Sequence, residues 1–276
     1  MEFIRQYYFD FNVMGDNFSE VLKGFWLTLQ LSIAAGILSL IWGLILAVIR
    51  QLPGKAALPF RWLSIAYIDA FRGIPLLLVL LLVSGGLSAL SSPIGNDVIP
   101  DFIGKPTWFG QTSPFWYGVI SLTITYGAYM AEVYRAGIEA VPGGQMEAAR
   151  SIGMSHGKAM RYVIVPQAIR KVIPPLLNDF IALMKDTSLV SILGAADVVY
   201  VGRQVQSDTF NGSALVLGAI MFLIITIPLA RLVDVLIARQ QNRTQRSGDS
   251  NDDAYDINEF AGGTPPSTGG GLGGPT

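Results

Sequence analysis

Few residues in this 276-residue sequence could do chemistry, and most of them lie inside long apolar segments. The candidates are one acid in an earlier apolar segment and a cluster in a later one: Glu132, then Asn178, Asp179, Lys185, Asp186, Thr187 and Ser188. A charge at the middle of a bilayer costs about 2.5–3.5 kcal/mol on insertion scales, so such residues normally face a cavity or a partner. The candidates therefore indicate either a path for a polar solute or a structural ion network, and both readings stay open.

The run "KDTS" at 185–188 is the deepest of these groups. It lies about 15 residues beyond Lys171, or roughly 22 Å along a helix. Adjacent residues point about 100° apart, so we expect Lys185 and Asp186 to have separate partners or the helix to break there. After such a break, Thr187 and Ser188 could cap a restarted helix, and freed backbone groups could bind a charged solute.

The other intramembrane charges have simpler interpretations. Glu132 and Arg135 are three residues apart, which favours an intrahelical pair, and Asp69 and Arg72 share this spacing. Asp179, with Asn178, lies one or two turns before Lys185, where these residues would contact solute or pair with that lysine.

Several kinds of chemistry are disfavoured. There is no Cys and only one His, His156, so thiolate metal sites and histidine clusters are excluded. The Gly-Lys pairs at 54–55, 104–105 and 157–158 all lack the phosphate-binding loop pattern, so ATP hydrolysis would need another chain. A net charge of −1 gives no basic face for nucleic acid. A membrane-embedded enzyme would need a catalytic pair built on Glu132 or Asp186.

The elements that position these residues are membrane spans. Charged residues are 14% of the chain and hydrophobic residues 51%, with a mean hydropathy of +0.46. About 20 mostly apolar residues make a span, and we expect five, at 25–49, 62–90, 115–133, 169–193 and 214–237. The fold class predicted is therefore an all-α integral membrane protein.

Lys and Arg counts predict the orientation. With the polar segment 147–166 in the cytoplasm, eleven Lys and Arg residues lie on that side and four on the other. The N-terminus is then outside and the C-terminus cytoplasmic. We expect residues 1–20 to be an outer segment, 91–114 to be an inert outer loop rather than a cover for a pathway, and 241–276 to be a disordered tail.

The polar segment "EAARSIGMSHGKAMRYVIVP", residues 147–166, interrupts the apolar pattern. Pro and Gly at 142–144 precede a short helix beginning near Gln145, with Glu147 in its first turn, where the helix dipole favours an acid. Ala148 and Ala149 leave a flat surface, and Gly153 ends the helix. The segment is either a docking helix for a soluble partner or a plain interfacial helix.

A resemblance distinguishes these two readings. Glu147, Ala148, Ala149, Gly153 and Pro166 match the EAA loop of ABC-importer permeases, with Val163 and Val165 as mild departures. Four further blocks, "GFWLTLQLS" (24–32), "FRGIPLLLVLLL" (71–82), "AYMAEVYRAGIEAVPGGQMEAARSIGMS" (128–155) and "VIVPQAIRKVIPPLLNDFIALMKDTSLVSILG" (163–194), resemble polar amino acid permeases of the histidine, glutamine and glutamate type. The resemblance covers about residues 20–240.

The resemblance implies a type I transmembrane domain over 21–240, with 143–166 as the coupling segment. In this family two permease subunits form the pathway, as a homodimer or a heterodimer, and two cytoplasmic ATPases that use ATP and Mg²⁺ drive it. A binding protein outside the cell delivers the amino acid. The chain would then lie in the bacterial inner membrane, bind no cofactor itself, and move glutamate or glutamine by alternating access. The alternative is a standalone carrier or channel for small polar solutes, which leaves the EAA block unexplained.

Overall fold

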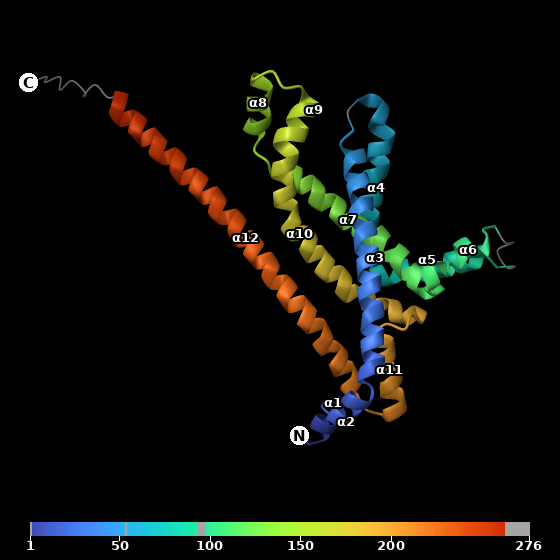
Figure 1. Ribbon diagram of the computed structural model, residues 1–276. Coiled ribbons are helices and arrows are strands. Elements are labelled where there is room, and N and C mark those ends of the chain that lie inside the picture. Colours follow the sequence, from blue (N-terminus) through green and yellow to red (C-terminus); the bar gives the residue numbers. More distant parts are fainter. Residues whose placement is uncertain (1, 53, 93–97, 263–276) are drawn as a thin grey trace, which may run out of the picture. The chain divides into compact units, whose positions relative to one another are not determined.

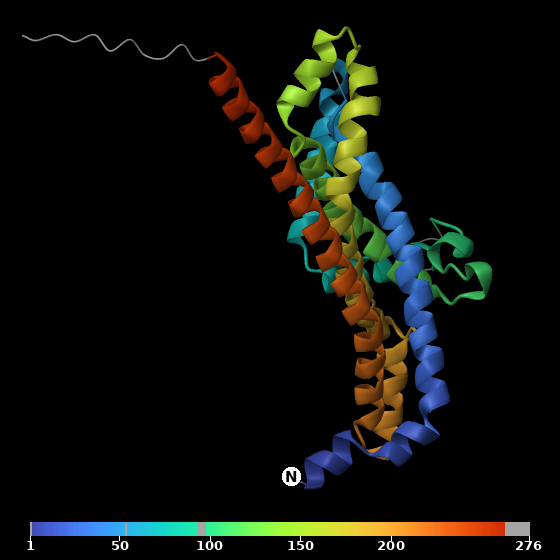
Figure 2. The ribbon, with the colours of Figure 1, turned by 60° about the vertical axis from the view of Figure 1, so that its left-hand side comes forward.

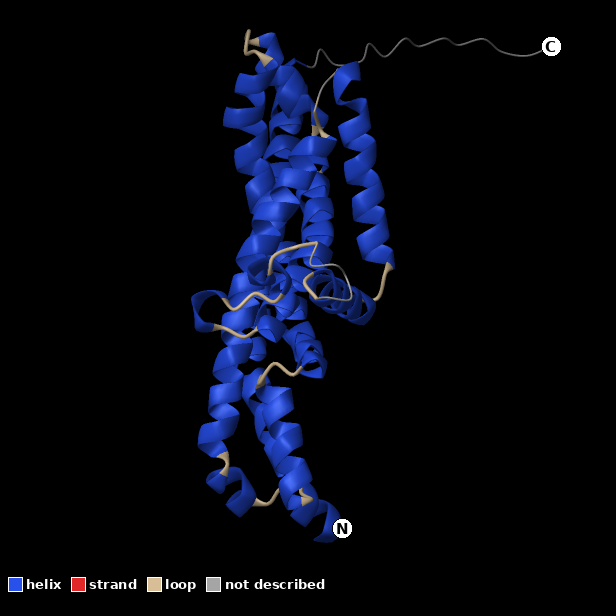
Figure 3. Ribbon diagram, turned by 90° about the vertical axis from the view of Figure 1, so that its right-hand side faces the viewer, coloured by secondary structure: helices blue, strands red, loops and turns tan. Residues whose placement is uncertain are grey.

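The computed structural model describes residues 2–52, 54–92 and 98–262, with side chains as far as residue 240. Its described residues form helices joined by turns and contain no strand (Figure 3). The longer helices are α3 (Phe18–Arg50), α4 (Leu58–Gly73), α5 (Leu76–Leu90), α7 (Ser113–Glu139), α10 (Val165–Asp186), α11 (Val198–Thr209) and α12 (Ser213–Gly262). The predicted all-α class is confirmed.

Helix α3 is the axis around which α4, α7, α10 and α11 pack (Figure 1). Small residues allow its close approach to α7. A Cβ atom on Gly43 would lie 2.8 Å from the backbone oxygen of Gly127, so neither helix has room for a larger residue there. The core between these helices is aliphatic and buries Leu31, Leu122 and Leu183.

The span predicted at 62–90 is two helices rather than one. Helices α4 and α5 meet at a bend of 110°, where Ile74 is extended with a ψ of 131°. Pro75 explains the break, because a proline disfavours helical geometry in the residue before it. The sequence "RGIP" therefore leaves Ile74 and Pro75 outside any helix.

The change of helix type after Asp186 is the second break in the fold. Helix α10 ends there and the chain continues as a 3-10 helix, η5 (Thr187–Leu193), before Gly194 turns it with a φ of +87°. The sequence suggested that Thr187 and Ser188 could cap a restarted helix, but they do not. Their hydroxyls instead donate to the carbonyls of Met184 and Lys185, each at 2.7 Å, and tighten the preceding turn.

Two groups of short helices lie at opposite ends of the bundle formed by α3, α4, α7, α10 and α11 (Figure 2). At one end are α1 (Glu2–Tyr8) and α2 (Phe11–Asp16), beside the start of α12. At the other are α8 (Gly143–Ser151), α9 (His156–Ala159) and η4 (Met160–Ile164), a stretch of π-helix that leads into α10. The loop before α7 carries α6 (Asp101–Gly104) and η3 (Trp108–Gly110), while η1 (Lys55–Ala57) precedes α4.

The chain divides into two units, 1–234 and 235–276. Helix α12 continues through residue 262, so the part of the predicted disordered tail up to that point is helical. Extending an existing helix costs less than starting one, which allows a polar sequence to continue it. The remainder of the predicted tail, 263–276, lies outside the described residues.

Two described helices are long and apolar enough to cross a membrane, Phe18–Arg50 and Ser213–Gln240. The bent pair α4 and α5 passes the same test jointly and would make a third span. Helices α7 and α10 do not reach that hydropathy; α7 carries Glu132 and Arg135, and α10 carries Asp179 and Lys185. Five spans and their orientation therefore remain a prediction.

Candidate functional site

The bend between α4 and α5 opens a cavity of about 400 Å³ against α7 and α10. We call it the charged cavity because Arg72, Asp179 and Asp186 line it, together with Tyr126. Gly73, the last residue of α4, and the non-helical residues Ile74 and Pro75 form part of its wall. Its size is within the usual range for small-molecule sites.

Hydrogen bonds and ring contacts orient the polar side chains of the charged cavity. The Tyr126 hydroxyl donates to Asp186 Oδ2 at 2.8 Å, which fixes that carboxylate between α7 and α10. The Arg72 guanidinium lies 5.7 Å from the centre of the Tyr129 ring, whose hydroxyl donates to the Arg72 carbonyl at 3.3 Å. Asp179 Oδ2 is buried and has no hydrogen-bond partner among the described residues.

This set of groups suits a zwitterion. Arg72 supplies a cation that pairs with a carboxylate, while Asp179 and Asp186 supply acceptors for an ammonium group. The Asp179 Oδ2 atom is buried without a hydrogen-bond partner among the described residues, and such burial of a polar atom costs free energy. A ligand that donates hydrogen bonds would offset that cost.

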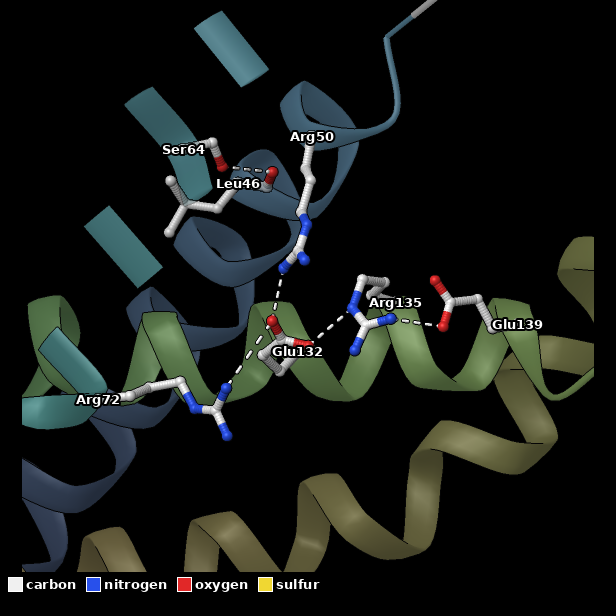
Figure 4. Close-up of polar contacts among 7 residues, drawn as sticks. All are labelled: Leu46, Arg50, Ser64, Arg72, Glu132, Arg135 and Glu139. Carbon is white, nitrogen blue, oxygen red and sulfur yellow. Dashed lines mark hydrogen bonds and ion pairs between the residues drawn. The ribbon is translucent and has the colours of Figure 1, made fainter. Parts of the chain in front are cut away.

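Arg72 also links the cavity to an ion cluster on α7 (Figure 4). Glu132 lies at the centre, 2.5 Å from Arg50 at the end of α3, 2.7 Å from Arg135, and 3.8 Å from Arg72 at the end of α4. The predicted pair of Glu132 and Arg135 is present, with two further partners from other helices. The predicted ion pair between Asp69 and Arg72 is wrong, because Arg72 pairs with Glu132 instead.

We expect Glu132→Gln to lower the thermal stability of the solubilised protein. The Glu132 side chain is only 16% exposed. Replacing its carboxylate by a neutral amide leaves Arg50, Arg72 and Arg135 without their shared counter-charge. Breaking a buried ion pair costs about 3–5 kcal/mol; partial exposure of these arginines reduces this to about 2 kcal/mol. Thermal unfolding in detergent measures it.

The matched control for that variant is Glu139→Gln on the same helix. Glu139 is 61% exposed, and among the described side chains its ion-pair partner is Arg135. Its loss should leave the melting temperature within about 1 °C, since exposed pairs contribute little. Equal melting temperatures for the two variants would show that Glu132 does not join the three helices energetically.

The other candidates from the sequence do not line the charged cavity. Lys185 and Ser188 line a separate, mainly apolar cavity of about 260 Å³ against α12. Thr187 is fully buried, and Asn178 is exposed. The structure therefore brings together only Asp179 and Asp186 from the "KDTS" group and its neighbours, and it separates Asp179 from Lys185.

Sequence reasoning missed Arg72 and Tyr126 as cavity residues. The spacing of Asp69 and Arg72 assigned Arg72 to an intrahelical ion pair. Tyr126 has no charge that would distinguish it within an apolar segment. The signal that could have found Arg72 is the proline three residues later, because a helix break beside a charged residue at membrane depth marks a binding site in many transporters.

The polar segment forms a second site, at the end of the molecule that carries α8. Helix α8 begins at Gly143, two residues earlier than expected, so Glu147 lies in its second turn rather than its first. Glu147 and Ala148 are exposed, whereas Ala149 is 5% exposed and packs within its own chain. The flat outer surface predicted from both alanines therefore rests on Ala148.

The end of α8 depends on Gly153. Its φ is +84°, in the left-handed region that favours glycine. Its amide donates to the Arg150 carbonyl at 3.0 Å, and the Met154 amide donates to the Ala149 carbonyl at 3.1 Å. These two bonds form a Schellman motif, which satisfies carbonyls at the helix end. Ser155 then caps α9 through the Lys158 amide at 3.4 Å, so the turn between the helices is fully specified.

Comparisons with known proteins agree on one family. The sequence profile described as "Binding-protein-dependent transport system inner membrane component" matches residues 39–244. A probable glutamine ABC transporter permease of Bacillus subtilis (strain 168) is 36% identical over 83% of this chain and 96% of its own. A glutamate/aspartate import permease of Escherichia coli O157:H7 is 30% identical over 84% of this chain and 99% of its own. A solved amino acid ABC transporter with histidines superposes with a TM-score of 0.71 at 34% identity, covering 83% of this chain and 98% of the solved one.

Proposed function

The chain belongs to the binding-protein-dependent transport system inner membrane components, and on that premise we propose that its charged cavity carries the amino acid while α8 receives movement from a separate ATPase. The chain is the permease of an ABC importer for polar amino acids in the inner membrane. A permease subunit has the role of a pore. The proposal concerns which residues of this chain bind the amino acid and which receive movement from the ATPase.

The charged cavity is the observation that carries the transport part. Arg72 would bind the α-carboxylate of the solute, and Asp186, oriented by Tyr126, would bind its α-ammonium. Asp179 would contact the ammonium or a side-chain amide through its unpaired buried oxygen. Glutamine and glutamate are the favoured solutes, because the names of two similar permeases include glutamine and glutamate/aspartate.

Helix α8 carries the coupling part. Glu147 and Ala148 face outward on a short helix whose end is fixed by Gly153, and a small residue beside an acid allows close docking into a groove of another protein. The turn after Gly153 leads through α9 and η4 directly into α10, which holds Asp179 and Asp186. A displacement of α8 would therefore be transmitted to the cavity wall through α9, η4 and α10, which follow one another without a break.

The Glu132 cluster lies between these two parts. It joins the ends of α3 and α4 to α7, and Arg72 belongs to both the cluster and the cavity. A solute carboxylate that attracts Arg72 would compete with Glu132, at 3.8 Å, for the same cation. Binding of the solute would thus alter the contact that holds α4 to α7, which is one route to alternating access. A second permease subunit would close the pathway.

Uptake into proteoliposomes tests this function against the alternative of a standalone carrier. The permease complex with its ATPase is reconstituted with enclosed ATP, and the binding protein is added outside. We expect uptake of labelled glutamine to be at least ten times faster with ATP than without it, and to be inhibited by unlabelled glutamate or glutamine but not by leucine. Equal uptake without ATP or without the ATPase subunit would establish a carrier instead.

A further inference from the structure

Residues 2–16 contain the helices α1 and α2 and lie outside the family match at 39–244. Helix α1 is amphipathic, since at about 100° per residue its apolar side holds Phe3, Ile4, Tyr7 and Tyr8 and its polar side Glu2, Arg5 and Gln6. Phe3 is 76% exposed, and Phe11 at the start of α2 is 77% exposed. A water-soluble surface rarely places such large apolar side chains together without a partner.

Hydrogen bonds fix this segment to the turn between α11 and α12. The Gly212 amide donates to the Tyr7 carbonyl at 2.8 Å, and the Asn211 side chain donates to the Gln6 carbonyl at 2.9 Å. The Asp10 amide donates to the Ser213 hydroxyl at 2.9 Å. In α2, Met14 is buried. The segment is therefore a docked part of the fold, and its exposed apolar residues are held in place.

The docking position places this segment beside the start of an apolar helix. Ser213 is the first residue of Ser213–Gln240, which is long and apolar enough to cross a membrane, and the turn bonded to α1 directly precedes it. The same turn holds Phe210, which is 85% exposed with a φ of +52°. Helix α3, the other described helix that is by itself long and apolar enough to cross a membrane, starts directly after α2. The starts of these two helices thus lie beside α1 and α2, at the end of the molecule opposite α8 (Figure 2).

We propose that α1 and α2 lie along the membrane surface at that end, with Phe3, Ile4, Phe11 and Phe210 inserted among the lipids. Lipid is the occupant because α3, which is long and apolar enough to cross a membrane, directly follows this segment and exposes Leu22 and Trp26 near its start, at 47% and 61%. Amphipathic helices bind in this way through an apolar face at the headgroup boundary, and aromatic residues gather at that depth. The proposal does not depend on the substrate or on the coupling site.

The charge of the segment predicts how it binds. Residues 1–16 hold three acids, Glu2, Asp10 and Asp16, and one base, Arg5, for a net charge of −2. Attraction to anionic headgroups is therefore absent, and burial of apolar area would supply the binding free energy. We expect insertion to be insensitive to salt and to the fraction of anionic lipid.

Site-directed spin labelling tests the proposal cleanly, because the chain has no native cysteine. The variants Phe3→Cys and Phe11→Cys carry the label on the apolar side, and Gln6→Cys and Asn12→Cys provide exposed polar controls on the same helices. The full transporter is placed in nanodiscs of phosphatidylethanolamine and phosphatidylglycerol. Power saturation then compares the accessibility of each label to oxygen, which enriches in lipid, and to a water-soluble nickel chelate.

We expect the ratio of oxygen to nickel accessibility to be at least threefold higher at positions 3 and 11 than at positions 6 and 12, at low and high salt. Equal, nickel-accessible labels at all four positions would overturn the proposal, since the segment would then lie in water. Labels at 3 and 11 that become protected only when the binding protein is added would also overturn it and identify a protein as the occupant.

Discussion

Gly153→Val is expected to reduce ATP-driven uptake at least tenfold while the protein still inserts into the membrane. The φ of +84° at Gly153 is an outlier for a β-branched residue, so valine would force the turn into another conformation. The bonds from Gly153 to Arg150 and from Met154 to Ala149 would then be lost, and α8 would no longer have a fixed orientation against α9. Uptake and co-purification of the ATPase subunit measure the effect.

The matched control is Gly157→Val in the same segment. Gly157 lies in α9, has no positive φ, and has open space where a Cβ would go, so valine there should keep uptake within about twofold of the wild type. A Gly153→Val protein that transports as well as the Gly157→Val protein would contradict the coupling role of α8. Loss of insertion in the Gly153 variant would place the residue in folding instead.

Asp186→Asn is expected to have the second large effect, a fall in uptake of about 10- to 100-fold. The amide keeps the shape of the side chain and still accepts from Tyr126, so the change removes the charge alone. A hydrogen bond to a charged group contributes about 1.5–3 kcal/mol, which corresponds to that range. The solute's ammonium would lose its charged partner, and the concentration for half-maximal uptake should rise before the maximal rate falls.

Asp69→Asn provides the control for this charge removal. Asp69 lies on α4, one turn before Arg72, but it is exposed and does not line the charged cavity. Its neutralisation should leave uptake unchanged, and both variants should retain the ATPase subunit on purification. Identical uptake by the two variants would mean that the charged cavity does not hold the solute.

The sequence was sufficient for features that depend on local chemistry. Gly153 was expected to end a helix, and it does so with a left-handed φ, because few other residues satisfy that geometry. A helix break at Lys185 and Asp186 was one of the two outcomes expected from the sequence, and the helix type does change after Asp186. Family motifs at 71–82 and 147–166 predicted the permease class, which the comparisons confirm.

Features that depend on contacts between helices were not predictable. Arg72 and Asp69 share one helix turn, so spacing favoured their pairing, but Glu132 on another helix is the ion-pair partner of Arg72. The sequence allowed Asp179 either to contact solute or to pair with Lys185, and only packing assigns Asp179 to the charged cavity and Lys185 to the apolar one. Ala149 matched a docking motif, yet its direction on α8 buries it.

The central claim is that this permease is driven through α8 by a separate ATPase, and site-specific cross-linking tests it most directly. A photoactivatable reagent is attached to Ala148→Cys on the exposed side of α8, with Asn12→Cys at the opposite end as control. The purified transporter is irradiated in nanodiscs, and the cross-linked partners are identified by mass spectrometry. We predict an ATPase subunit at position 148 and none at position 12. A transporter active in ATP-dependent uptake whose position 148 cross-links only to lipid or to its own chain would contradict the account.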